Sequence, residues 1–507
     1  MIGNNGKLAN GNRFAQSVAA GTIVVTLFTL FSKALGFARE ILIANLFGTS
    51  WRLDAVFIAI TPVTIVTGIA TGGIIAIFFP IYHELKIKDS GKAIRYAGSL
   101  MKLYSLVFIL LGIIFYLFPD EIVKLFAPGF SGDVLSYAAR KLKYLSILPF
   151  INGLQALLGA LLRAERCFFQ YGIAQLIFNF VAIPVIYLGA PFFSEASYVL
   201  ATILGNLLVL ILYFGFSRRF LSFRGEFFLK ETSQTFRLAL PFMLSSSLST
   251  INIVVDKMFV STLPSGRVSS LQYSTTLLGI ISTVVSIFAM TSFTELSEKV
   301  AAKNMNGALE RMKKTVTSSL NIAIPLTVWT AVMAEYLIRF VFQHGAFSAE
   351  STDLVSAALI GYSAMLIIRP ISTVSSNFLT TIKKVKWIFY VVPISITANA
   401  FFDWILIKPF SHAGVAASTS IVLLINTFIK VRIVKHYGME FVPVARILKQ
   451  IAIAASIGLS IHFLRNIVGS IEWLVIGNMV FLSLFVIMAH DELRAVANKL
   501  KAFRRKK

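Results

Sequence analysis

The chain has 507 residues, of which 57% are hydrophobic and only 14% are charged, with a formal net charge of +24. Soluble domains carry about 25% charged residues, so this composition excludes a soluble globular protein and predicts an integral membrane protein. The basic residues lie in connections between apolar stretches, which argues against nucleic acid as a partner. The single cysteine, Cys167, excludes an internal disulfide and a cysteine-based metal site.

Apolar runs separated by charged or turn-forming residues predict an all-α protein, because about 20 apolar residues cross a bilayer as a helix. The polar N-terminus has no small-residue cleavage site, so the first run is expected to be a retained helix rather than a signal peptide. Fourteen membrane-spanning helices are predicted near 17–47, 54–83, 97–118, 135–163, 168–191, 195–216, 234–262, 268–296, 315–334, 353–381, 387–408, 412–433, 446–464 and 471–490.

The connections between these helices alternate in charge. Links after even-numbered helices are basic, as in 86–95, 218–237 and 299–314, whereas links after odd-numbered helices hold one Lys or Arg or none. Basic loops stay in the cytoplasm, so both termini are predicted to be cytoplasmic. The exception to this alternation is a basic group in the outer part of the fourth helix, formed by Arg140, Lys141 and Lys143.

An internal repeat relates residues 125–150 to residues 341–366, at an offset of about 216 residues or six predicted helices. An even number of helices preserves orientation, so the repeat predicts two parallel six-helix lobes around a central cavity, with two appended C-terminal helices. The predicted parts are a cytoplasmic N-terminus (1–16), an N-terminal lobe (17–216), a basic amphipathic linker (217–233), a C-terminal lobe (234–433), appended helices 13 and 14 (434–490) and a basic cytoplasmic tail (491–507).

Charged side chains within the first predicted helix, and at the start of the second, are the strongest functional signal. They are Lys33, Arg39, Glu40 and Asp54. Each charge at membrane depth costs roughly 2.5–3.5 kcal/mol on insertion scales, so such residues usually face a partner or a water-filled cavity. Arginine offers a fork that fits phosphate oxygens, and the two acids would hold the cations when no ligand is bound. The alternative is a salt-bridge network that only fixes helix packing, or side chains that snorkel to the inner interface.

Further charged residues lie within later helices. Arg369, just before Pro370, is a candidate for a second cation that faces the cavity, and Asp403 is expected near the outer interface in contact with water. Asp256 and Lys257 form either an interfacial pair at the outer surface or a functional pair. In the second helix, Pro62 and a series of small residues predict either a bent helix that lines the cavity or close helix packing.

Sequence motifs of soluble catalytic centres are absent. The chain has no GxxxxGK[ST], GxSxG or HExxH sequence and no paired carboxylates on a soluble segment. We therefore expect a protein that is not an enzyme, has no cofactor or metal, and does not hydrolyse ATP.

At its charged helix the chain resembles a known family. The segment LFSKALGFAREILIANLFGTSWRLDAVFIA is similar to the MurJ/MviN signature, S-R-x-L-G-F-x-R-[DE] followed by F-G-x-G-x-x-x-D-A-F, and further similarities lie at 125–133, 341–363 and 407–426. The family belongs to the multidrug/oligosaccharidyl-lipid/polysaccharide exporter superfamily. The resemblance implies a fourteen-helix flippase for lipid II, the undecaprenyl-pyrophosphate-linked peptidoglycan precursor. It also implies a cationic cavity between two lobes and a lipid-tail groove formed with the last two helices.

The resemblance implies substrate binding by the residues that match the family motif, and some motif positions are not matched. Ser32, Arg39, Glu40 and Asp54 match the signature, whereas Lys33 replaces the first arginine and keeps its charge without the bidentate fork. Neutral residues stand where many members carry a base, at Val66, Thr67 and Thr276. The resemblance therefore implies a cavity that is less cationic than is usual in the family.

The favoured function is translocation of lipid II across a bacterial inner membrane by alternating access, with membrane lipids around the protein. Energy is expected from the membrane potential or from a coupling ion. An alternative is a flippase for another polyprenyl-pyrophosphate-linked glycan, such as an exopolysaccharide or O-antigen precursor. Less favoured are a cation-coupled drug exporter, which would prefer acidic cavity residues, and a membrane enzyme such as a lipid-linked glycosyltransferase, which would need acidic or metal-binding loops.

Overall fold

The computed structural model describes residues 18–223, 229–384, 386–464 and 470–490, together with residues 467 and 494. This part of the chain is helical and contains no strand. The predicted N-terminus (1–16) lies outside the described residues, as do the middle of the predicted amphipathic linker (224–228) and the predicted basic tail, apart from residue 494.

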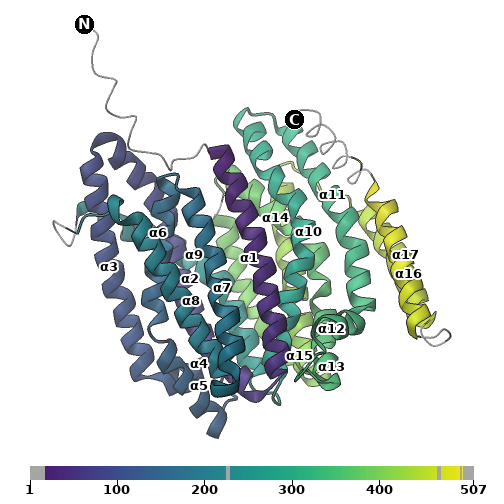
Figure 1. The fold of residues 1–507 in the computed structure, drawn as a ribbon. Coiled ribbons are helices and arrows are strands. Elements are labelled where there is room, and N and C mark those ends of the chain that lie inside the picture. The colour runs from purple at the N-terminus through teal and green to yellow at the C-terminus, as the bar shows by residue number, and fades with distance from the viewer. Residues whose placement is uncertain are drawn as a thin grey trace, which may run out of the picture. The chain divides into compact units, whose positions relative to one another are not determined.

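The chain divides into two compact units. The first extends to Val268 and also includes His344–Ala346, and the second comprises the rest of the chain. Helices of the first unit are α1 (Val18–Phe47), α2 (Trp51–Lys88), α3 (Ser90–Leu117), α4 (Pro119–Phe126), α5 (Gly132–Leu145), α6 (Leu148–Ala164), α7 (Phe168–Phe193), α8 (Ala196–Ser217), the 3-10 turn η1 (Arg218–Phe220) and α9 (Lys230–Val260) (Figure 1).

The second unit is formed by the remaining helices, beginning with the bulk of α10. They are α10 (Arg267–Ala301), α11 (Met305–Val332), α12 (Ala334–Phe342), α13 (Ala349–Ser363), α14 (Met365–Thr381), α15 (Lys386–His436), α16 (Val444–Leu464) and α17 (Ser470–Met488). The predicted lobes follow from the sequence repeat and stay a prediction, since the compact units follow packing and group α9 with the first unit, where it packs along α2.

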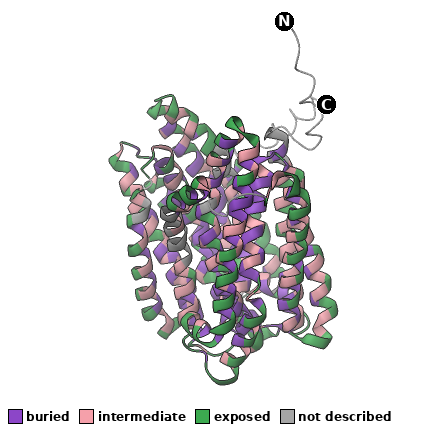
Figure 2. Cartoon of the chain, turned by 90° about the vertical axis from the view of Figure 1, so that its left-hand side faces the viewer, coloured by how far each residue is buried: buried purple, intermediate pink, exposed green. Residues whose placement is uncertain are grey.

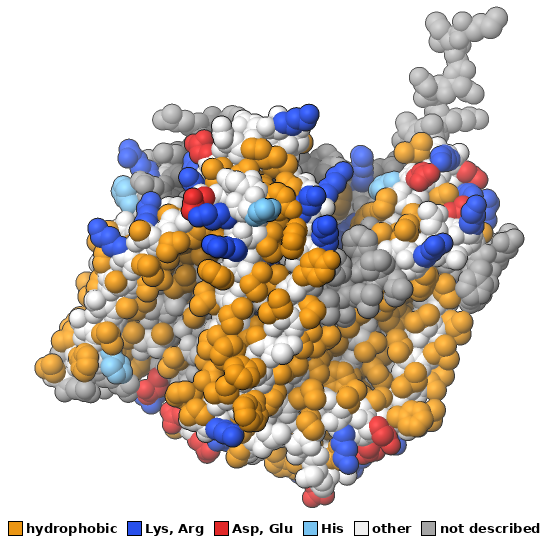
Figure 3. All heavy atoms as spheres, turned by 180° about the vertical axis from the view of Figure 1, so that it is seen from behind, with side chains coloured by type: hydrophobic (Ala, Val, Ile, Leu, Met, Phe, Trp, Pro, Cys, Tyr) orange, Lys and Arg blue, Asp and Glu red, His pale blue; other side chains and the backbone are white. Residues whose placement is uncertain are grey.

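Each unit has its own apolar core. In the first unit, Phe78 stacks on Tyr82 and Tyr96 with ring centroids 5.1 and 5.9 Å apart, and these rings join α2 to α3. In the second, Trp473 of α17 packs on Tyr336 of α12 at 4.8 Å. Figure 2 shows that buried residues follow one side of many helices and exposed residues the other. On the face shown in Figure 3, hydrophobic side chains cover the middle of the helices and charged ones gather near the helix ends.

Most helix bounds lie within about five residues of the predicted ranges, but α3 and α11 begin 7 and 10 residues earlier than predicted. Two predicted helices are interrupted. The fourth is α5 followed by α6, bent by 43°. The tenth is α13 followed by α14, and α15 contains the eleventh and twelfth, joined at Ser411, which has a positive φ of 53°. Among the described residues, nine helices are long and apolar enough to cross a membrane, or ten if the bent pair is one span. The all-α membrane architecture is confirmed, and the count of fourteen stays a prediction.

The basic group that breaks the charge alternation lies on α5. The Nζ atom of Lys141 is 4.4 Å from the ring centroid of Tyr137 and 5.9 Å from that of Tyr144. Lys143 lies 5.9 Å from the ring of Tyr116 on α3. Cation–π contacts and long apolar stems suit such residues to a membrane interface, which explains how a predicted outer segment carries them.

We predict that cysteine labelling will report the alternation of the loops. Cys167 is almost fully buried, and burial raises the pKa of its thiol, so it should react slowly and its removal should leave a clean background. In a Cys167→Ser background, an impermeant maleimide added to intact spheroplasts should label Glu121→Cys and spare Lys88→Cys and Lys303→Cys. All three positions are exposed. Labelling of Lys88→Cys from outside would refute the predicted orientation.

Candidate functional site

Arg39 lies on α1, which packs against α7 in the first unit. Two glycines let these helices approach closely, because a Cβ at Gly21 would collide with Phe168 and a Cβ at Gly172 would collide with Phe28. Small residues at such contacts are common between membrane helices. The close packing brings the polar residues of the two helices together.

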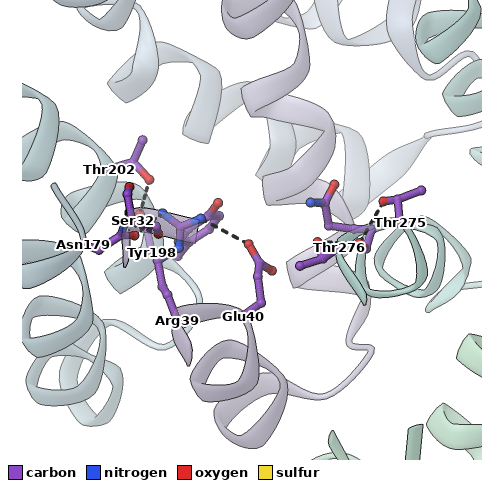
Figure 4. Close-up of polar contacts among 9 residues, drawn as sticks. Ser32, Arg39, Glu40, Asn179, Tyr198, Thr202, Thr275 and Thr276 are labelled. Atoms are coloured by element: carbon purple, nitrogen blue, oxygen red, sulfur yellow. Dashed lines mark hydrogen bonds and ion pairs between the residues drawn. The ribbon is translucent and has the colours of Figure 1, made fainter. Parts of the chain in front are cut away.

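The guanidinium of Arg39 is held by two polar contacts and two aromatic rings. Its Nη1 donates to Asn179 Oδ1 and its Nη2 donates to Glu40 Oε1, each at 3.3 Å. Its Cζ lies 5.2 Å from the ring centroid of Phe178 and 5.9 Å from that of Tyr198. Figure 4 shows Arg39 between Glu40 on one side and Asn179 with Tyr198 on the other. The rings and the amide fix the orientation of the charged fork.

Asn179 connects Ser32 to this arrangement. Its Nδ2 donates to the Ser32 backbone oxygen at 3.2 Å and is 3.4 Å from Ser32 Oγ. Ser32 Oγ in turn donates to the backbone oxygen of Gln175 at 3.1 Å. The structure therefore brings together three predicted site residues, Ser32, Arg39 and Glu40.

Three contributors were not predicted as site residues: Asn179, Phe178 and Tyr198. Asn179 gave a signal in the sequence, because it is an amide within an apolar helix, with a counterpart at Asn399 in the repeat. Phe178 and Tyr198 gave none, since aromatic residues are frequent throughout membrane helices.

The Arg39–Glu40 pair is buried and incompletely satisfied. The side chains are 16% and 5% exposed. Arg39 Nε and Glu40 Oε2 are buried and have no hydrogen-bond partner among the described residues. A buried ion pair is stable only if further hydrogen bonds satisfy its remaining atoms. Arg39 thus keeps spare donor capacity for an anionic ligand, with Glu40 as its counter-ion in the absence of one.

The other two predicted residues of the first unit lie elsewhere. Lys33 is exposed on α1. Asp54 is buried at the start of α2, where its Oδ2 accepts from the backbone N–H of Gly266 at 2.6 Å. Gly266 has a φ of +88° and lies against Thr49, so this turn requires a glycine. Asp54 therefore ties the turn between α9 and α10 to α2, and its role in substrate binding stays a prediction.

Lys257 makes contacts that differ from those of an exposed interfacial pair. Its Nζ donates to Thr61 Oγ1 at 2.6 Å and to the Phe57 backbone oxygen at 3.5 Å, both on α2. Its neighbour Asp256 is buried. Lys257 therefore joins α9 to the part of α2 that precedes Pro62.

In the second unit, Arg369 is exposed on α14, one helical turn before Ser372. Asp403, which we expected to be wet near an interface, is fully buried and accepts from Asn399 Nδ2 at 3.0 Å, so that expectation is wrong. The physical reason is the break at Ser411, after which α15 returns along its own first half, with Gly414 packed on the Leu406 backbone.

The neutral residues at the positions of missing cations do not replace them. Thr67 Oγ1 donates to Val63 O at 2.6 Å, and Thr276 Oγ1 donates to Gln272 O at 2.9 Å. Both hydroxyls are engaged within their own helices. Val66, half-buried on α2, has no polar group in its side chain.

Comparisons with known proteins agree on one family. The family model described as lipid II flippase MurJ matches residues 43–485. The lipid II flippase MurJ of Thermosipho africanus is 27% identical over 486 residues, covering 94% of this chain and 98% of the relative. The match to the family model begins after Ser32, Arg39 and Glu40, so their assignment rests on the resemblance of their motif and on their geometry.

Solved structures give the same result. A structure described as lipid II flippase MurJ in an inward closed conformation superposes with a TM-score of 0.80 at 25% identity, covering 94% of this chain and all of that one. An inward-facing multidrug resistance MATE family transporter superposes with a TM-score of 0.66 at 14% identity, covering 86% and 99% of the two chains. The second likeness shows the fold alone.

We predict that Arg39 and Glu40 are coupled in stability. Glu40→Ala leaves a buried guanidinium without its carboxylate and should destabilise the protein by about 3 kcal/mol, whereas Arg39→Ala/Glu40→Ala should cost less than the sum of the single changes. Thermal unfolding of the detergent-purified variants measures this. Arg95→Ala, at an exposed pair with Asp89, is the control and should change little. Strict additivity of the two changes would show that the buried pair contributes no coupling.

Proposed function

The chain belongs to the lipid II flippase MurJ family, and on that premise we propose that it translocates lipid II across the bacterial inner membrane by alternating access. The observation that carries the proposal is the family match over residues 43–485. The proposal includes a transport role without a chemical step of its own, and both termini in the cytoplasm. Lipid II carries a pyrophosphate, so the protein must hold an anion at membrane depth and then release it.

Arg39 is the residue best suited to hold the pyrophosphate. A guanidinium binds phosphate oxygens through two parallel charge-assisted hydrogen bonds. The rings of Phe178 and Tyr198 and the amide of Asn179 already orient this fork, so little conformational freedom is lost on binding. Glu40 would pair with Arg39 in the empty carrier and give way to the pyrophosphate, which returns the site to its neutral state after release.

Ser32 and Lys33 would complete the first-unit site. Ser32 is linked to Arg39 through Asn179, so it would position the amide rather than bind phosphate directly. Lys33 supplies a second positive charge on α1 without a fork. Asp54 would act on the geometry of the α9–α10 turn through its bond to Gly266.

The lipid tail would lie along α17. Two apolar cavities of about 340 and 460 Å³ flank Trp329 of α11 and Asn478 of α17. Trp329 Nε1 donates to Asn478 Oδ1 at 3.0 Å, which satisfies both polar groups and leaves the remaining lining apolar, apart from Arg339 at one end. The volumes and the apolar lining, which includes Leu326, Phe481 and Leu482, suit a hydrocarbon chain.

Energy coupling would involve the buried carboxylate of Asp403. A carboxylate removed from water needs a proton, a cation or strong hydrogen bonds. Asp403 accepts a hydrogen bond from Asn399, which is itself fully buried. Binding and release of a proton or a monovalent cation at this carboxylate would couple transport to an ion gradient.

A second candidate is a flippase for another polyprenyl-pyrophosphate-linked glycan. The neutral residues Val66 and Thr276 favour it, since a less cationic site suits a head group with fewer negative charges than the lipid II glycopeptide. The same pyrophosphate would be held by the same arginine. Gene neighbours and the choice of rescued mutant separate the two candidates.

We expect the chain to restore growth of a mutant depleted of its lipid II flippase. Arg39→Ala should abolish rescue while the protein still reaches the membrane, and Arg39→Lys should be impaired because the fork is lost. Lys33→Ala should be nearly as damaging as Arg39→Ala, whereas Lys33→Arg should be tolerated. Rescue of a polysaccharide-flippase mutant instead would select the second candidate, and full rescue by Arg39→Ala would remove Arg39 from the binding site.

For the lipid tail, we predict that a large side chain at the α17 cavity interferes with transport. Leu482→Trp should reduce growth rescue by filling the cavity at Phe481 and Phe485. Leu459→Trp on α16 is the matched control, because Leu459 is also exposed, at 59%, and lines neither cavity. Equal rescue by the two tryptophan variants, at equal membrane levels, would argue against a tail site here.

A further inference from the structure

Two cations of the second unit have no counter-ion among the residues that the structure describes. Lys430 of α15 is half-buried, and its Nζ donates to Ser372 Oγ on α14 at 3.2 Å. Arg369 lies one turn before Ser372 on the same helix. Within the described ranges, no carboxylate lies within ion-pair distance of either cation, in contrast to Arg39, which has Glu40.

The depth of these residues argues against simple snorkelling. Ser372 lies nine residues before the end of α14 at Thr381, which is about 13 Å along a helix, and Arg369 lies about 18 Å from that end. Lys430 lies six residues before the end of α15 at His436, about 9 Å. A snorkelling lysine directs its ammonium toward the nearer helix end. The ammonium of Lys430 instead contacts Ser372 Oγ, which lies on the neighbouring helix and well within it.

A cation at membrane depth is stabilised by water, by neutral polar groups or by an anion, and an anion compensates its charge most fully. Ser372 is suited to assist. Its oxygen accepts from Lys430, so its own hydroxyl proton points elsewhere and can donate to a second acceptor. One face of α14 thus presents a guanidinium and a hydroxyl, and α15 adds an ammonium.

We propose that Lys430, with Ser372 and Arg369, forms a second anion-binding subsite that takes a phosphate group of the lipid-linked glycan. The proposal rests on the proposed function and extends it, since it adds a phosphate contact formed by residues of the second unit. The subsite supplies positive charge in a chain whose residues at Val66 and Thr276 are neutral. Its ligand is a phosphate ester on a polyprenyl lipid, and Lys430 contributes charge and hydrogen bonding rather than chemistry.

Binding of undecaprenyl pyrophosphate to the purified full-length protein in nanodiscs of neutral lipid tests the subsite. Lys430→Gln should weaken binding by about tenfold or more, as expected for a lost charge-assisted hydrogen bond, and Lys430→Arg should keep most of it. Arg432→Gln is the matched control, because Arg432 is exposed on the same helix two residues away. Undecaprenol, which has no phosphate, should bind all variants equally. Equal affinity of Lys430→Gln and Arg432→Gln would overturn the subsite.

A stability measurement separates ligand binding from a structural role. Without ligand, Lys430→Met should unfold at the wild-type temperature or above it, because it removes a desolvated charge, and it should gain less stabilisation from added undecaprenyl pyrophosphate. A lower unfolding temperature without ligand would mean that the bond to Ser372 is structural and would refute the proposal.

Three outcomes have distinct meanings. If phosphatidylglycerol in the nanodisc displaces undecaprenyl pyrophosphate from wild type and not from Lys430→Gln, the subsite belongs to bulk phospholipid and the proposal fails. If wild type does not bind undecaprenyl pyrophosphate at all, the proposed function fails, whatever the variants do. If wild type binds undecaprenyl pyrophosphate and Lys430→Gln binds it as tightly as the control Arg432→Gln, the second subsite is wrong and the proposed function is unaffected.

Discussion

The absence of water around buried charge is the constraint on which the first-unit site depends. A guanidinium at membrane depth depends on partners within the protein or in a water-filled cavity. Arg39 has Glu40 beside it, Asn179 on α7 and two aromatic faces, while its Nε has no hydrogen-bond partner among the described residues. The same contacts hold α1 against α7, so the group that would bind the ligand also fixes the packing around it.

The same constraint accounts for polar contacts away from the site. Lys257 on α9 donates to Thr61 on α2, and Asp54 accepts from a backbone N–H of the α9–α10 turn. Each bond satisfies a costly polar group and joins segments about 200 residues apart in sequence. Many serine and threonine hydroxyls of the described helices donate to the carbonyl four residues earlier, as Thr67 does. The main role of these polar residues is therefore to form hydrogen bonds within a helix or between neighbouring segments.

Helix positions could be predicted from the sequence, whereas the partners of the charged residues could not. Apolar length and charge alternation place most helices to within about five residues. They describe 135–163 as one helix, although Pro149 at the start of α6 marks the 43° bend. The choice between Glu40 and Asp54 as the partner of Arg39 depends on Asn179, which lies 140 residues away. Asp403 was misplaced because its burial depends on how the two halves of α15, which were predicted as separate helices, pack on each other. Hydropathy gives helix positions and not this packing.

Arg39 differs from Arg369 and Lys430 in how its positive charge is neutralised among the described residues, and the difference bears on how a carrier works. A site that is neutral when empty, such as Arg39 with Glu40, binds an anion only by displacing its own carboxylate, and that competition limits affinity and speeds release. Cations without a carboxylate, such as Arg369 and Lys430, gain more from an anion and hold it longer. Transport requires binding strong enough to capture the ligand and weak enough to let it go. Under the proposed function, Arg39 paired with Glu40 in one unit would favour release. Arg369 and Lys430, which have no carboxylate partner among the described residues, would favour capture.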